Sequence, residues 1–85
     1  MTPLESEVAL LMVDALNLEL APETIDPAAP LYREGLGLDS IDLLELSVVI
    51  AKRYGFQIKS DDPDTTQIFS SLGALAATIE RRRTL

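Results

Sequence analysis

The chain contains no cysteine, no histidine and no tryptophan. Without cysteine it cannot form disulfide bonds, thiolate metal sites or a cysteine nucleophile, and without histidine it lacks the most common proton shuttle and metal ligand. Most hydrolytic mechanisms lose a required group, so we predict neither catalytic residues nor a metal site. Aromatic residues are also scarce, at 5%, which predicts a largely aliphatic core and favours packed helices.

Basic residues are nearly absent from the first half of the chain. Residues 1–45 hold ten acidic residues but only Arg33 as a base, and the whole chain has a net charge of -7. This charge repels nucleic acid and anionic lipid surfaces, and it favours a basic partner for the first half. The longest apolar run there, Val8 to Val13, is too short for a membrane span or a signal sequence. We therefore expect a soluble, cytoplasmic protein.

Length and composition predict one compact domain, residues 1–85, since 47% hydrophobic and 25% charged residues are typical of a globular chain. Capping residues and helical spacing predict a first helix from Pro3 to Leu18. A long loop, residues 17–39, is too rich in proline and glycine for a helix. We expect its apolar residues to hold it on the core: Ile25, Leu31, Tyr32, Leu36 and Leu38.

Three further helices are predicted. The second runs from Ser40 to Arg53, with Asp39 as its cap and Gly55 after its end. A short helical turn follows around residues 64–69, with Ile68 and Phe69 inward, and Ser71 caps a last helix. Its expected inner stripe is Leu72, Leu75, Ala76 and Ile79. The predicted fold is therefore an all-α four-helix bundle with three longer helices and one short one. Strands at residues 47–50 and 54–58 are the less favoured alternative, because neither segment is bounded like a hairpin.

The second helix is apolar nearly all round, more than a small core can hide. We expect part of it to stay exposed, with Ile41, Leu44 and Val48 at the surface. The core-facing residues of the same helix are expected to be Leu46, Ile50 and Tyr54.

The most informative segment reads Gly35-Leu36-Gly37-Leu38-Asp39-Ser40-Ile41-Asp42. It places the Ser40 hydroxyl in the first turn of a helix, where a phosphate ester is favoured by the positive helix end. No histidine exists, and no lysine lies nearby in sequence to activate the hydroxyl, so another enzyme would have to do so. Taken alone, Asp39 and Ser40 are equally typical of an ordinary helix start.

With its long loop, apolar second helix and acidic first half, the chain resembles free-standing (type II) acyl carrier proteins. The family's Asp-Ser-Leu motif corresponds to Asp39-Ser40-Ile41. The resemblance implies a single acyl carrier domain with 4′-phosphopantetheine on Ser40, transferred from coenzyme A by a Mg-dependent phosphopantetheinyl transferase. The cofactor would supply the thiol that this chain lacks, and acyl or polyketide chains would be held on it as thioesters.

The resemblance also implies which residues meet partners. Asp39 is either a helix cap or a contact for the transferase, and Asp42 and Glu45 resemble the acidic residues that partner enzymes recognise. Ile41, Leu44 and Val48 would form the apolar centre of that contact. The implied partners are the transferase, acyl-loading enzymes, ketosynthases and other acyl-processing enzymes, with the carrier a monomer.

One segment departs from the family. Carriers of bacterial fatty acid synthesis continue the second helix with glutamates, whereas this chain has Ala51-Lys52-Arg53-Tyr54-Gly55. Together with Gly-Leu-Gly-Leu-Asp-Ser-Ile-Asp, this segment is similar to carriers of aryl polyene and related specialised lipid pathways. Two alternatives stay open at this point: a peptidyl or D-alanyl carrier, and an unmodified helical adaptor that binds one protein permanently.

Overall fold

The computed structural model describes residues 2–31, 37–58 and 64–84, and this part of the chain is helical without strands. Its elements in chain order are α1 (Pro3–Leu16), the 3-10 turn η1 (Pro22–Thr24), α2 (Ser40–Tyr54), α3 (Thr65–Ile68) and α4 (Leu72–Arg82). The predicted bundle of three longer helices and one short helix is confirmed. The segment 47–50, considered as a strand, lies inside α2, and the described residues of 54–58 contain no strand either.

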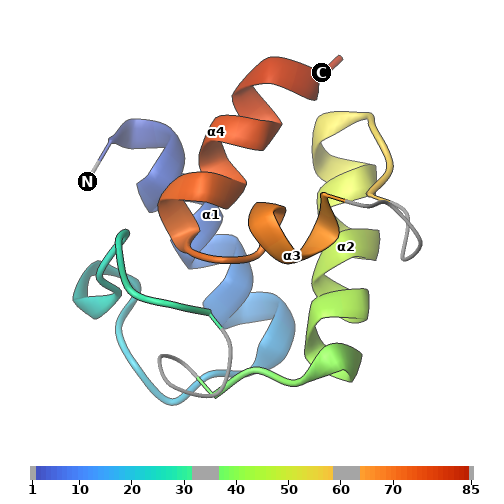
Figure 1. The fold of residues 1–85 in the computed structure, drawn as a ribbon. Helices are drawn as coiled ribbons and strands as arrows, with labels where there is room; N and C mark the ends of the chain where they lie inside the picture. The colour runs from blue at the N-terminus through green and yellow to red at the C-terminus, as the bar shows by residue number, and fades with distance from the viewer. Residues whose placement is uncertain (1, 32–36, 59–63, 85) are drawn as a thin grey trace.

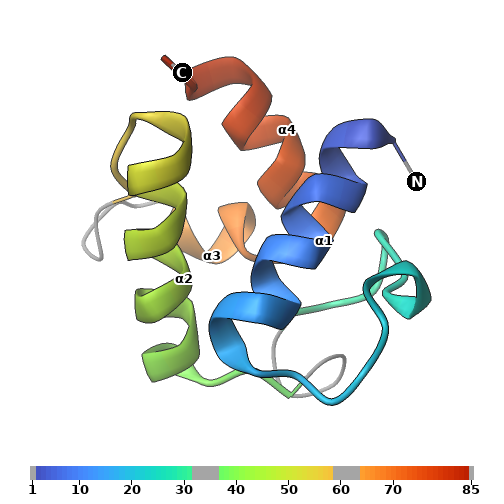
Figure 2. The same cartoon turned by 180° about the vertical axis from the view of Figure 1, so that it is seen from behind.

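The helices surround one core. Figures 1 and 2 show α1 and α4 on one side of the molecule and α2 on the other, with α3 lying between α4 and α2. α1 packs against both α4 and α2, and α3 packs against α4. Within the described ranges, no helix has both the length and the apolar character of a membrane span.

The first helix ends earlier than predicted. Thr2 and Glu5 form the expected capping box at its start, but the helix stops at Leu16 and not at Leu18. Asn17 adopts the left-handed conformation with φ 55°, and the N–H groups of Asn17 and Leu18 both bond to the carbonyl of Val13. Asparagine tolerates this conformation better than most residues, so it closes the helix where glycine often would.

Among the described residues the core is aliphatic, with two buried aromatic side chains, Tyr54 and Phe69. The expected core face of α2 is confirmed, since Leu46, Ile50 and Tyr54 are at most 1% exposed. The predicted inner stripe of α4 is buried throughout, as are Ile68 and Phe69. The helices therefore meet through the faces that their hydrophobic spacing predicts.

The long loop between α1 and α2 is held to the bundle at several points. Ile25, Leu31 and Leu38 are buried as expected, whereas Tyr32 and Leu36 lie outside the described residues. η1 was not predicted, although Pro22 at its first position suits a helical start.

A backbone contact also joins this loop to α4. The N–H of Gly73 donates to the carbonyl of Pro27 at 2.9 Å. A Cβ atom at residue 73 would lie 3.2 Å from the same oxygen. Glycine therefore permits the loop to approach α4 closely.

Candidate functional site

The start of α2 is fixed by two carboxylates that cap each other's backbone. The Asp42 N–H donates to Oδ1 of Asp39 at 2.9 Å, and the Asp39 N–H donates to Oδ2 of Asp42 at 3.2 Å. This reciprocal capping box confirms Asp39 as the N-cap. It also gives Asp42 a structural part that the sequence analysis missed, although an acid three residues after a capping residue is its usual signal.

Two buried leucines hold this first turn in place. Leu38 precedes the cap and is 2% exposed, and Leu43 is 6% exposed. The Leu38 N–H also donates to the carbonyl of Leu31 at 3.2 Å. Gly37, just before Leu38, has φ 75°, which favours glycine, while open space surrounds the position of a Cβ. Ser40 is thus the first residue of a helix whose entry is anchored on both sides.

The outer side of α2 presents apolar groups to solvent. Ile41 is 73% exposed, Leu44 59% and Val48 49%. Together with Glu45, which is also exposed, they form what we name the exposed face of α2. Their spacing of three and four residues places them on one side of the helix. Contiguous apolar groups at the surface of a small protein are typical of a binding surface.

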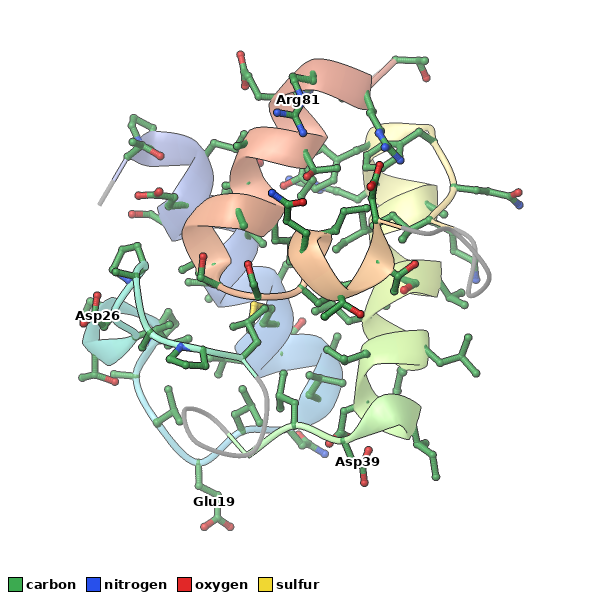
Figure 3. All side chains as sticks on the ribbon, in the orientation of Figure 1. Glu19, Asp26, Asp39 and Arg81 are labelled. Carbon is green, nitrogen blue, oxygen red and sulfur yellow. The ribbon has the colours of Figure 1, made fainter. Side chains whose placement is uncertain are left out.

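The acidic residues predicted to meet partners differ in how free they are. Glu45 is exposed, whereas Asp42 is half-buried and one of its oxygens bonds to the Asp39 N–H. Figure 3 shows Asp39 and Glu19 at the end of the molecule where α2 begins, and Arg81 at the opposite end. Asp39 and Glu19 thus place acidic groups at the end of the molecule where α2 begins (Figure 3).

The far end of α2 is tied to α1 by a contact that the sequence analysis missed. Glu7 accepts hydrogen bonds from the Arg53 guanidinium and the Tyr54 hydroxyl, each at 3.0 Å. The bond from Arg53, and after it the bond from Tyr54, lowers the pKa of Glu7. Burial, and after it the bond to Glu7, raises the pKa of Tyr54. Since these residues are 46 and 47 positions from Glu7, local sequence patterns carry no signal for the contact.

The residues that follow α4 also contact Tyr54 and its neighbour Gly55. The Arg83 guanidinium lies 5.1 Å from the centre of the Tyr54 ring, within cation–π distance. The Thr84 N–H donates to the carbonyl of Tyr54, and the Thr84 hydroxyl donates to the carbonyl of Gly55. α1, α2 and the residues after α4 therefore meet around one tyrosine.

Several other serine hydroxyls are already used within their own helices or turns. The hydroxyl of Ser47 donates to the Leu43 carbonyl, and that of Ser70 donates to the Gln67 carbonyl. The hydroxyl of Ser71 accepts the Ala74 N–H as the cap of α4. Ser6 is exposed within α1 and is not the first residue of a helix.

A comparison with protein families shows which family the chain matches. The family described as "Phosphopantetheine attachment site" matches residues 7–79, from the first turns of α1 into the last turns of α4. The match thus spans most of the chain and includes the whole of α2. No curated protein matches the chain in the comparison made with such proteins.

Proposed function

The chain belongs to the phosphopantetheine attachment site family, and from this premise we propose that it is an acyl carrier whose arm is attached to Ser40. Members of this family are carrier domains that hold 4′-phosphopantetheine covalently on a serine. The observation that carries the choice of Ser40 is its place as the first residue of α2, directly after the Asp39 cap. The hydroxyls of Ser47, Ser70 and Ser71 are taken up in local hydrogen bonds.

The surroundings of Ser40 suit a large charged arm. Its two neighbours in the chain, Asp39 and Ile41, are both exposed. A phosphodiester on Ser40 would lie at the positive end of α2, which favours an anion. The attached group supplies the thiol on which acyl chains are held. The protein's own contribution is a doubly capped first turn, with the attachment residue at the start of α2.

We propose that partner enzymes dock on the exposed face of α2. Exposed Glu45 offers a carboxylate to basic residues of a partner, and Ile41, Leu44 and Val48 offer an apolar centre. Asp42 can meet a partner mainly through Oδ1, because its Oδ2 accepts the Asp39 N–H. We propose phosphopantetheinyl transferase, acyl-loading enzymes and ketosynthases as partners, met one at a time by a monomeric carrier. Coenzyme A is the donor of the arm, which supports a cytoplasmic location.

The attachment is tested by intact mass after incubation with coenzyme A and a broad-specificity phosphopantetheinyl transferase. The protein should gain the mass of one phosphopantetheine. The Ser40→Ala variant should gain none, whereas Ser6→Ala, the same change at an exposed serine of α1, should gain it fully. An unmodified wild-type protein under conditions that load a known carrier would show that the chain is an adaptor without an arm.

The nature of the cargo needs a second measurement. We propose acyl groups because Asp39-Ser40-Ile41-Asp42 and its flanks resemble carriers of lipid pathways. The loaded carrier should accept an acyl group from an acyl-loading enzyme and pass it to a ketosynthase. Loading by an adenylating enzyme with an amino acid, and failure with acyl donors, would instead identify a peptidyl or D-alanyl carrier.

A further inference from the structure

Lys52 lies on the same side of α2 as the residues that we propose to meet partners. It follows Val48 by four residues and Glu45 by seven, so helical geometry places it in line with them. Its side chain is exposed. The exposed face of α2 therefore begins with apolar Ile41 and Leu44, carries the acid Glu45 before Val48, and is followed by a cation.

The neighbouring base has a different part. Arg53 points to α1, where its guanidinium bonds to Glu7 at 3.0 Å. The Lys52 side chain forms no ion pair or hydrogen bond with the described residues, and it is exposed to solvent. The two adjacent bases thus divide into one that holds helices together and one that is available to a partner.

A general preference for bases near helix C-termini does not account for this placement. Both Lys52 and Arg53 lie in the last turn of α2 and complement the helix dipole. That effect depends on distance from the helix end and is the same on every side of the helix. It does not require a cation in line with Leu44 and Val48.

The charges of Glu45 and Lys52 are far enough apart to act separately on a partner surface. Seven helical residues separate Glu45 from Lys52, or about 10 Å along the axis. This distance equals or exceeds the screening length of about 8–10 Å in physiological salt. A partner surface that is basic along its whole length would be attracted at Glu45 and repelled at Lys52.

We propose that Lys52 is a specificity-determining residue of the docking surface. It selects partner enzymes that place an acidic side chain opposite the end of α2, and it disfavours enzymes whose carrier-binding surface is basic throughout. The preferred partner has basic residues facing Glu45, an apolar patch facing Leu44 and Val48, and a carboxylate facing Lys52. This inference rests on the proposed carrier function and adds the charge pattern of its partners.

The test uses a disfavoured enzyme as its probe, so the natural partner need not be known. The probe is a ketosynthase of bacterial fatty acid synthesis whose carrier-binding surface is basic throughout. Three proteins are converted to the holo form and acylated with the same chain: wild type, Lys52→Gln and Lys52→Glu. They are then compared by kcat/KM for acyl transfer to the ketosynthase. Arg81→Glu, on α4, makes the same change in net charge away from the exposed face and serves as the matched control.

We expect Lys52→Glu to raise kcat/KM about fivefold, mainly through a lower KM, and Lys52→Gln to raise it about twofold, as for exposed charge pairs. Arg81→Glu should stay near the wild-type value, and the gain should shrink at high salt. Equal rates for all variants, or an equal gain from Arg81→Glu, would overturn the role of Lys52. Intact mass separates the two proposals: a wild type that cannot be loaded refutes the carrier function itself, whereas full loading with unchanged rates refutes only this inference.

Discussion

Replacing Tyr54 with phenylalanine removes one hydroxyl and leaves the buried ring in place. The ring is 1% exposed, and its hydroxyl donates to Glu7 at 3.0 Å. A hydrogen bond to a charged group contributes roughly 1.5–3 kcal/mol when both partners are buried. The Glu7 side chain is 41% exposed, so its carboxylate can turn to water once the hydroxyl is gone. We therefore expect a loss below this range, about 1 kcal/mol.

This loss should depend on pH in a defined direction. The pKa of Glu7 is lowered from its ordinary value of 4.5. A carboxyl group with a lowered pKa stabilises the folded state above its unfolded value, and this contribution disappears as the pH falls through the folded value. The difference between wild type and Tyr54→Phe should therefore be full at pH 7 and smaller in acid, where a neutral carboxyl group accepts a weaker hydrogen bond.

Urea denaturation followed by far-ultraviolet circular dichroism measures both effects, at pH 7 and again at a pH below the lowered pKa of Glu7. A loss of about 1 kcal/mol corresponds to a fall in Tm of about 4–8 °C for a domain of this size. Arg53→Gln is a useful companion, because its exposed ion pair with Glu7 should matter less than the tyrosine bond. Equal stability of Tyr54→Phe and wild type at pH 7, or an equal loss at both pH values, would refute the reasoning.

Two further changes test the start and the faces of α2. Asp39→Ala should lower the free energy of unfolding by about 1 kcal/mol because the cap is lost, while Asp39→Asn should keep most of the cap's stabilisation. If the transferase loads Asp39→Asn at the wild-type rate, the charge of the Asp39 carboxylate has no role in loading. Leu46→Ala should cost about 3 kcal/mol because the side chain is fully buried, whereas Leu44→Ala should cost less than about 0.5 kcal/mol. Chemical denaturation compares this pair, and similar losses for both would contradict the assignment of inner and outer faces.

Much of this fold can be predicted from local sequence patterns. Thr2, Asp39 and Ser71 are capping residues that mark helix starts, and in the structure each of these three caps its helix where the pattern predicts it. The separation of α2 into a buried and an exposed side also follows from sequence, because spacing shows which apolar residues can face the core together. The surplus of apolar residues on that helix then identifies the exposed ones.

Contacts between distant residues could not be obtained in this way. The bonds from Arg53 and Tyr54 to Glu7, and the approach of Gly73 to Pro27, depend on how the helices pack in three dimensions. The end of α1 was misplaced for a different reason, since a left-handed asparagine is one of several ways to end a helix. For the proposed site, Ser40 rests on a motif and on its place at a helix start, and both can be read from sequence.

The exposed apolar side chains of α2 have a consequence for how the protein behaves in concentrated solution. Two copies that brought these surfaces together would bury apolar side chains, but each copy carries a net charge of -7. Mutual repulsion therefore keeps the molecules dispersed under neutral, low-salt conditions. Acidification toward the isoelectric point removes that protection, so clustering of the protein should begin in mildly acidic solutions while its helices are still intact.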